Sequence, residues 1–356
     1  MPSHLKLDGN GLEFRFPDHH PDATLSINFQ RTLRIPDDGK KYPLPPGLGN
    51  FPIRRVDDHK DRVPEKWVRH GGAFLPMYQS EAMWIAFHGQ SIHRRGTAYP
   101  MAVKVSAGMR SAVTGEERRD GLNQKDYVII PKQPWLDGFA VGRGVIAQFV
   151  AMPLGMGFTA EEQLSGKAEH GGVQIEVFPM KKEAFERRFP IQPEYRSRGV
   201  MRSTAMSYGG GRNIWQGLEL CSASFDMGLG AGGQMEQQIY EDPYDFEDWD
   251  LTNPLKVFVH IANSLAWRAI TGQEPPSTPA TAAAYTRAGL PWFDHYRDDL
   301  QVLEGSPKLA ALKTVLQLGF QKGFSPLPEN ESANPTNIKH LGDAPVAKDE
   351  IRQGSW

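Results

Sequence analysis

The chain has 356 residues, with 40 Lys and Arg against 42 Asp and Glu, and its formal net charge is −2. Because charges of both signs are interspersed, the sequence lacks the basic excess of a nucleic-acid-binding surface. No window approaches 18 consecutive apolar residues, and the N-terminus MPSHLKLDGNGLEF lacks the regions of a signal peptide. The single cysteine, Cys221, excludes an internal disulfide. We therefore expect no nucleic acid partner, no membrane insertion and a cytoplasmic location.

Alternation of apolar and polar residues predicts many short β-strands in the first 261 residues. It is clearest over Thr24–Ile35, where only Arg31 interrupts the apolar face. Further strands are expected at Met83–His88, Ala102–Ala107, Tyr127–Pro131, Val145–Met152, Val173–Phe178, Leu218–Phe225, Gln234–Tyr240 and Lys256–Ile261. Turn-forming residues lie between some of them. This succession of short strands and turns favours a sandwich or barrel-like sheet system over βαβ units.

The middle of the chain contains a short helix between two strands. Thr159 and Glu162 have the spacing of a capping box, in which each side chain satisfies the backbone N–H of the other residue. In Val173–Phe178, apolar residues alternate with Gln174 and Glu176, which predicts one buried face and one wet face.

The composition changes after residue 262 to favour helices. Helices are expected at Ser264–Thr271, after a cap at Thr278, at Pro291–Glu304, and after Ser306. The tail that follows is polar, with apolar residues only at intervals. We expect a β-rich body (1–261), a helical segment packed on it (262–323) and an extended C-terminal arm (324–356). The fold class is mainly β, sandwich or barrel-like, with a C-terminal helical segment, and α+β overall.

The glycines from Gly228 to Gly233 match the G-x-G-x-x-G pattern of dinucleotide sites. Such a site needs a parallel βαβ unit with a helix N-terminus behind the glycines. The segment after them is short and ends at a proline, so we expect a glycine-rich hairpin or loop instead, and no cofactor.

An acidic stretch, YEDPYDFEDWD, offers the best metal candidates: Asp242, Asp245, Asp248 and Asp250. Dense carboxylates are hard oxygen ligands that could hold Ca²⁺, although the spacing is not that of an EF-hand. The alternative is a solvated acidic loop with aromatic anchors.

Several other residues could have a functional role, although each could also be explained by a structural one. His88 and His93 lie five apart without the spacing of a zinc helix. Asp294 and His295 could polarise a nucleophile, but the sequence has no nucleophile elbow to receive them. His260 and Cys221 are expected to be structural, buried in strands.

Several long phrases carry a resemblance to known sequences. They are FQRTLRIPDDGKKYPLPPGLG, FLPMYQSEAMWIAF, FVAMPLGMGFTAEEQ, GGVQIEVFPMK, VFVHIANSLAWRAITG and AGLPWFDHY. Through about residues 25–320 the chain resembles a family of uncharacterised proteins from actinobacteria and filamentous fungi. Some members carry the label "integral membrane protein", which disagrees with the hydropathy of this chain. The resemblance implies no activity and no functional residue.

Two functions remain open on the sequence. We favour a non-enzymatic binding or self-assembling scaffold protein, a homo-oligomer joined through its C-terminal arm, because no motif places a nucleophile, base and oxyanion donor together. The alternative is an enzyme acting on a small molecule or carbohydrate in a sheet-lined cleft, with Trp135, Trp215 and Trp249 as its apolar walls. A pocket with converging Asp, His and Arg would favour the enzyme.

Overall fold

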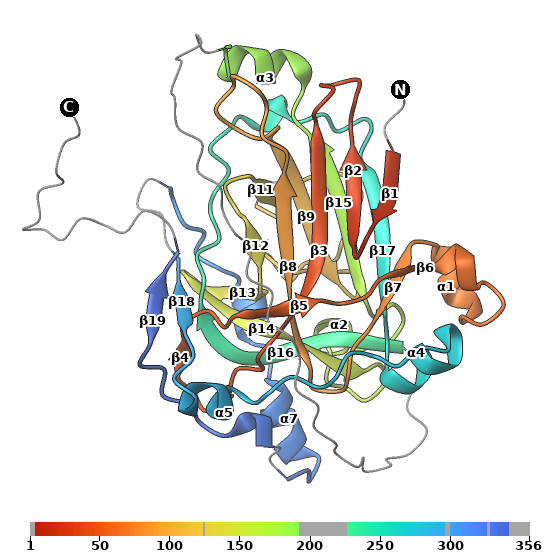
Figure 1. Cartoon of the computed structure of the whole chain (residues 1–356), viewed down its shortest axis with the longest axis vertical. Coiled ribbons are helices and arrows are strands. Elements are labelled where there is room, and N and C mark those ends of the chain that lie inside the picture. The colour runs from red at the N-terminus through yellow and green to blue at the C-terminus, as the bar shows by residue number, and fades with distance from the viewer. Residues whose placement is uncertain (1–3, 124, 192–225, 296–299, 326–327, 342–356) are drawn as a thin grey trace, which may run out of the picture.

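The computed structural model describes residues 4–123, 125–191, 226–295, 300–325 and 328–341 (Figure 1). Within them, strands form one large, mainly antiparallel sheet system with short helices at its margins, which confirms the predicted fold class. The strands are β1 (His4–Asp8), β2 (Gly11–Arg15), β3 (Thr24–Thr32), β4 (Lys41–Tyr42), β5 (Gly47–Asn50), β6 (Arg54–Arg55), β7 (Ala73–Pro76), β8 (Ala82–Gly89), β9 (Met101–Ala107), β10 (Arg110–Ser111), β11 (Val128–Ile130), β12 (Trp135–Leu136), β13 (Gly138–Gly142), β14 (Val145–Pro153), β15 (Val173–Pro179), β16 (Asp226–Glu236), β17 (Leu255–Ala262), β18 (Trp292–Asp294) and β19 (Ile338–His340).

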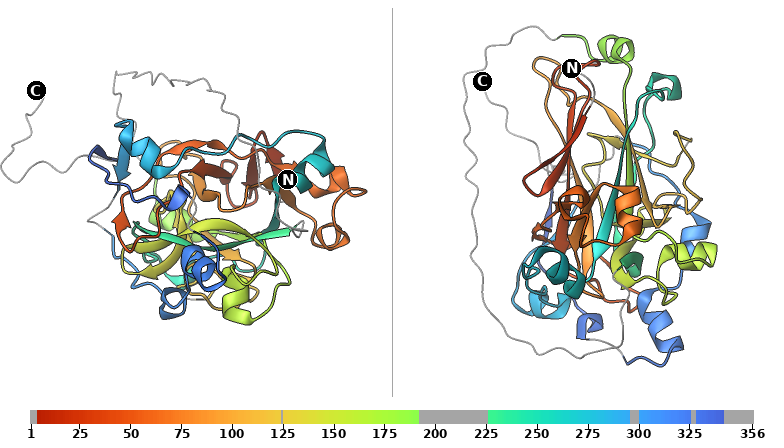
Figure 2. Two further views of the ribbon diagram at one scale, coloured as in Figure 1. Left: turned by 90° about the horizontal axis from the view of Figure 1, so that it is seen from below. Right: turned by 90° about the vertical axis from the view of Figure 1, so that its right-hand side faces the viewer.

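Two layers of strands pack against each other (Figure 2). In one layer β1, β2, β3 and β8 are antiparallel neighbours, and in the other β7, β17, β15 and β9 lie side by side. The long strands β14 and β16 connect the layers. β14 pairs with β8 through Phe149 and Met83, and β16 pairs with β14 and then with β17 through Met227 and Ile261.

The inner faces of the two layers form the hydrophobic core. Leu25, Ile27 and Phe29 of β3 are fully buried, as their alternation predicts. Arg31, which interrupts this row, is also buried and donates two hydrogen bonds to Glu81 Oε1, from Nε at 2.9 Å and from Nη2 at 2.7 Å. The charge within the apolar row is therefore paired inside the fold.

Two adjacent glutamates at the start of α2 (Ala160–Ser165) organise the loops on either side of it. The predicted capping box is present: Thr159 Oγ1 accepts from the Glu162 amide at 3.2 Å, and Glu162 Oε2 accepts from the Thr159 amide at 3.1 Å. Glu162 Oε1 also accepts backbone hydrogen bonds from residues 155 and 157. Glu161 accepts three from residues 169–171 at 2.7–2.9 Å. The acidic pair thus satisfies donors of two glycine-containing turns.

The prediction of a glycine-rich hairpin or loop at Gly228–Gly233 is wrong, because these glycines lie inside the single strand β16. They are required by close packing. A Cβ atom on Gly228 would lie 2.8 Å from Thr159 Cγ2, and one on Gly230 would lie 2.7 Å from the Phe158 carbonyl oxygen. Glycines in this strand therefore mark a close approach of neighbouring segments rather than a phosphate-binding turn.

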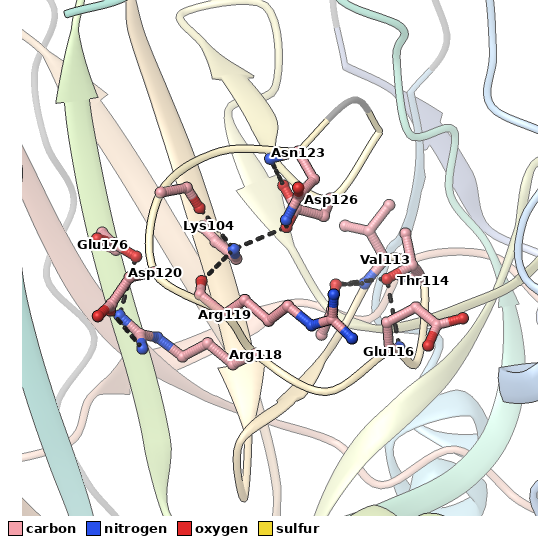
Figure 3. A network of polar contacts seen from close by, with 12 residues as sticks. Lys104, Val113, Thr114, Glu116, Arg118, Arg119, Asp120, Asn123, Asp126 and Glu176 are labelled. Carbon is pink, nitrogen blue, oxygen red and sulfur yellow. Dashed lines mark hydrogen bonds and ion pairs between the residues drawn. The ribbon is translucent and has the colours of Figure 1, made fainter. Parts of the chain in front are cut away.

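The prediction of a wet face on β15 is also wrong, because every residue of this strand is buried. Strand register sets Lys104 of β9 and Lys256 of β17 on either side of Glu176, so charges alternate across three strands. Residues 112–123, which follow β10, and Asp126 form a covering segment over this row (Figure 3). The pattern of apolar and polar residues within one strand cannot predict such a cover, because the cover depends on tertiary contacts.

Each member of the row is paired by a residue of the covering segment. Arg118 Nη2 donates to Glu176 Oε2 at 2.9 Å, and Lys256 Nζ donates to Asp120 Oδ1 at 2.8 Å. Lys104 is fully satisfied: its Nζ donates to the carbonyl oxygens of residues 119 and 121 and lies 2.7 Å from Asp126 Oδ2. The covering segment is therefore held down by ion pairs as well as by its buried apolar residues Val113 and Leu122.

The α-helices are short and lie at the margins of the sheet system. They are α1 (Glu65–His70), α2, α3 (Lys182–Arg188), α4 (Ser264–Thr271), α5 (Ala282–Arg287), α6 (Pro307–Ala310) and α7 (Val315–Gln321), with 3-10 turns at Val56–His59, Phe246–Asp248 and Pro328–Asn330. None of the helices in the described ranges is long and apolar enough to cross a membrane.

Two details of the helical segment differ from prediction. The cap of α5 is Thr281, whose side chain accepts from the Ala284 amide, and not Thr278. The helix predicted at Pro291–Glu304 is wrong over the described residues, which instead begin with the strand β18. Trp292 of β18 is buried near Tyr42, with ring centroids 6.0 Å apart, so tertiary packing overrides the local helical signal.

The described part of the C-terminal arm lies on the body of the same chain. Ser332 Oγ donates to Asp38 Oδ2 at 2.7 Å, and the Ala333 amide donates to the Tyr42 hydroxyl at 3.2 Å. Further along, β19 pairs in parallel with β18. These contacts place residues 328–341 beside β4 and β18, where they help to build the cleft described next.

Candidate ligand-binding cleft

β4, the β13–β14 turn, the end of β16 and β18 meet on one side of the sheet system (Figure 1). Two adjoining hollows lie among these elements. Their volumes are about 320 and 290 Å³. Lys41, Glu236 and Asp294 line both hollows, and Arg143 and His295 line the larger one. We refer to the two hollows together as the charged cleft.

Strand pairing brings these residues together from distant parts of the sequence. β4 runs parallel to β16 with Lys41 opposite Gln234, so Glu236 lies two residues further along the same strand. Two backbone hydrogen bonds join Leu44 to Phe293, at 2.8 and 2.9 Å, and hold β18 beside the segment after β4. The cleft therefore depends on the register of short strands.

The C-terminal segment supplies one wall of the charged cleft. Ala333 and Ile338 line the smaller hollow. In the parallel pair formed by β18 and β19, His340 lies opposite Asp294, with His340 Nδ1 3.3 Å from Asp294 Oδ2. Residues of the predicted arm thus contribute directly to the site.

Two oppositely charged side chains in the cleft have no hydrogen-bond or ion-pair partner among the described residues. Across the part of the chain that the structure describes, neither the Lys41 ammonium nor the Glu236 carboxylate makes a hydrogen bond or ion pair. Arg143 lies 3.3 Å from Glu304, but these side chains are 65% and 77% exposed, so their pairing contributes little. A ligand in the cleft would find a cation and an anion ready to be paired.

Sequence analysis identified Asp294 and His295, and the structure places both at the cleft. His295 Nδ1 lies 2.8 Å from the Leu341 carbonyl oxygen, which can only accept, so Nδ1 carries the hydrogen. In the neutral ring Nε2 is then the acceptor, and this buried atom has no hydrogen-bond partner among the described residues. The ring packs against Trp135, with centroids 4.9 Å apart.

A buried carboxyl group lies directly behind the cleft. Asp137 Oδ1 accepts from Gln237 Nε2 at 3.1 Å, and the Asp137 amide donates to Gln237 Oε1 at 3.0 Å. Gln237 itself lines the larger hollow. Burial raises the pKa of Asp137 to about 7, opposed by the hydrogen bond from Gln237. A carboxyl group with such a shift beside a cleft is typical of a functional region.

The four aspartates predicted as metal ligands make hydrogen bonds to protein donors. Asp242 Oδ2 accepts from the Tyr127 hydroxyl at 2.7 Å and from Trp249 Nε1 at 2.8 Å. The Asp242 bond also contributes, after burial, to a raised pKa of Tyr127. These contacts anchor the acidic loop to the core through aromatic residues.

Arginines of α3 and a histidine engage the other three aspartates. Arg188 donates to Asp245 from Nη2 and to Asp248 from Nε, both at 2.5 Å, and Arg187 donates to Asp248 at 2.7 Å. Asp250 Oδ2 lies 2.8 Å from His19 Nε2. No group of three His, Cys, Asp or Glu in the described residues is arranged to hold a metal ion. Asp248 is buried, so the loop is not simply solvated either.

The remaining sequence candidates are dispersed. Trp135 lies beside the charged cleft, whereas Trp249 is a buried residue of the acidic loop and does not line the cleft. Trp215 and Cys221 lie outside the described residues. His88 and His93 are both exposed. His260 is buried as expected, and its Nε2 donates to the Gly71 carbonyl oxygen at 3.2 Å.

Sequence reasoning missed Lys41, Arg143 and Glu236. Lys41 lies within a proline-rich connection, and Glu236 ends a strand, so no local motif joins them. Only the parallel pairing of β4 with β16 brings them into one cleft.

No family model, no curated protein and no solved structure matches this chain. The functional proposals below are therefore supported by the geometry of this chain alone.

Proposed function

We propose that the protein is a non-enzymatic binding protein that holds a small zwitterionic molecule in the charged cleft. The observation that carries this proposal is the pair of uncommitted, opposite charges, Lys41 and Glu236, which line both hollows. An anionic group of the ligand would bind the Lys41 ammonium, and a cationic group would bind the Glu236 carboxylate. Asp294 adds a second negative charge to the cleft, and Arg143 adds a second positive charge.

The open geometry and mixed charge of the cleft indicate modest affinity. A hydrogen bond to a charged group contributes about 1.5–3 kcal/mol, so two such contacts support a Kd on the order of tens of micromolar to several millimolar. This range suits a molecule that the protein binds and releases.

A thermal-shift panel tests the proposal, with the α-amino acids and glucosamine 6-phosphate as probes. We expect at least one probe to raise the melting temperature of the wild type, and Lys41→Gln and Glu236→Gln to remove that effect. Lys60→Gln and Glu65→Gln are matched controls, because these residues are exposed and lie outside the cleft. Equal shifts in all four variants would contradict the proposal.

An enzyme acting on a small molecule or carbohydrate is the second candidate. The position of His295 favours it, because an imidazole that lines a hollow is a common general base in enzymes. Turnover of a bound probe that His295→Gln removes without loss of binding would establish the enzyme instead of the binding protein.

Homo-oligomerisation through the C-terminal arm and a cytoplasmic location remain predictions. Exposed apolar side chains near α7, Met156, Phe320 and Phe324, provide a surface for self-association. Light scattering of the full chain and of a chain ending at residue 341 would test whether the last residues join copies. A monomer at high concentration would contradict oligomerisation.

A further inference from the structure

A third hollow, of about 230 Å³, lies between the β13–β14 hairpin, β16 and α6. Its lining is mainly apolar and includes Val141, Val145, Ala147, Ala231, Leu309 and Leu312. We refer to it as the apolar groove. It adjoins the charged cleft, because Lys41 and Val145 line both.

Lys41 is the one charged residue among those that line the apolar groove. Its ammonium has no partner among the described residues. The polar Thr314 is already engaged, since its hydroxyl accepts from the Gln317 amide and donates to Asp37. Gln234 is the other polar side chain in the lining, and it is neutral. The groove therefore presents a mainly apolar surface with a single cation at its junction with the cleft.

We propose that the apolar groove binds a straight-chain aliphatic carboxylate, with its chain along Val145 and Leu312 and its carboxylate on the Lys41 ammonium. An apolar cavity of about 150 Å³ holds benzene, so this groove accommodates a chain of about six to eight carbons. The site goes beyond the proposed zwitterion site, because its ligand needs no cationic group. Both ligands would use Lys41, so each would exclude the other.

The charge of Lys41 determines which class of ligand the groove binds. A cation with no neighbouring carboxylate in the lining favours an anionic end group over a neutral or cationic one. The apolar walls favour a methylene chain, and each buried methylene strengthens binding by up to about fourfold. A short polar anion would meet the cation but leave the walls uncovered.

Gly142 provides a way to fill the groove without disturbing the core. A Cβ atom at this position would meet only Val145 Cβ, at 3.8 Å, which is an ordinary contact. Gly142 also lacks a positive φ, so a side chain causes no strain there. A leucine at position 142 would stand beside Val145 and occupy the space of the ligand chain.

Calorimetric titration with butanoate, hexanoate and octanoate tests the site. We expect octanoate to bind the wild type, and butanoate to bind at least about tenfold more weakly, because four methylenes are lost. Lys41→Gln should weaken octanoate binding by about tenfold or more, because it removes the cation that binds the carboxylate. Gly142→Leu should weaken it by a similar factor, because the leucine fills the space of the aliphatic chain. Lys60→Gln is the matched control, because Lys60 is exposed and lines neither the groove nor the cleft, and its octanoate affinity should stay within about twofold of the wild type.

Three results would overturn the inference: no octanoate binding at about 10 mM, which corresponds to a very weak site; equal binding of octylammonium, which would show that Lys41 does not select the charge; or unchanged binding in Gly142→Leu. Val145→Asn provides a second test of the chain site if Gly142→Leu does not fold. Octanoate binding without any amino-acid binding would support the groove and contradict the zwitterion proposal alone.

Discussion

Lys104 Nζ lies 2.7 Å from Asp126 Oδ2, in a position where the Lys104 side chain is 1% exposed. The same ammonium donates to two backbone carbonyl oxygens, so all three of its hydrogens are engaged. This contact joins the middle of β9 to the end of the covering segment (Figure 3). It turns what would be an open sheet face into the interior of the protein.

Lys104→Met should destabilise the protein by about 3–5 kcal/mol, because Asp126 and two carbonyl oxygens would lose their partner in a buried setting. Urea unfolding gives the free energy, and limited proteolysis reports opening of residues 115–126. Lys60→Met is the control, because Lys60 pairs with Asp57 on the surface, and its effect should stay within about 0.5 kcal/mol. Equal effects of the two substitutions would contradict the buried role of Lys104.

The contribution of His260 to stability should fall as the pH is lowered below about 6.5. His260 stacks between Trp67 and Phe258, with centroids 4.6 and 4.2 Å away, and burial lowers its pKa to about 3 from 6.5. Lys66 and His70 add positive charge nearby. Because the folded pKa is below the unfolded value, the unfolded chain binds the proton more readily, and stability present above pH 6.5 is lost on acidification.

Between pH 7.5 and pH 5 this group should reduce the free energy of unfolding by about 2 kcal/mol. Denaturant unfolding at the two pH values measures the change. His260→Phe keeps a ring in the stack and should remove this contribution, so the variant should lose about 2 kcal/mol less stability than the wild type between the two pH values. The same change in both proteins would assign the pH dependence to other groups.

Asp137 should have the opposite pH dependence. Its pKa is raised from 3.8 to about 7 by burial, so the folded state favours the protonated form. This group therefore reduces stability as the pH rises from about 4 to 7, by up to about 1.4 kcal/mol per pH unit. Asp137→Asn keeps an acceptor for Gln237 and should remove that slope. An unchanged slope in unfolding experiments would show that the carboxyl group is ionised in the fold.

Calcium should leave the melting temperature of the wild type unchanged. Arg187 and Arg188 already neutralise Asp245 and Asp248, and Asp242 accepts from Tyr127 and Trp249. A bound ion at 100 times its Kd would stabilise by about 2.7 kcal/mol. A rise of that size, reversed by EDTA, would establish the metal site that the acidic sequence predicts.

Local signals in the sequence predicted the parts of the fold that local interactions determine. The capping box of Thr159 and Glu162 and the alternation in Thr24–Thr32 are present in the structure. Two predictions were wrong: a wet face on β15 and a loop at Gly228–Gly233. In both cases the cause is a segment distant in sequence, which covers Glu176 in the first case and packs closely on β16 in the second.

The candidate site was predicted only in part for the same reason. Asp294 and His295 are adjacent in sequence and could be recognised as a pair. Lys41 and Glu236 are separated by most of the chain, and their shared cleft follows from the register of β4 on β16. That register has no signature in either segment, since β4 contains only two residues.

Charge exchange at Lys41 and Glu236 tests the central proposal most directly. Thermal shifts with the α-amino acids would be measured for the wild type, Lys41→Glu, Glu236→Lys and the double variant. We expect both single variants to lose the shift, because each leaves two like charges in the cleft, and the double variant to recover it with the ligand reversed. No shift in the wild type, or the same shift in Lys41→Glu as in the wild type, would contradict a zwitterion site in the charged cleft.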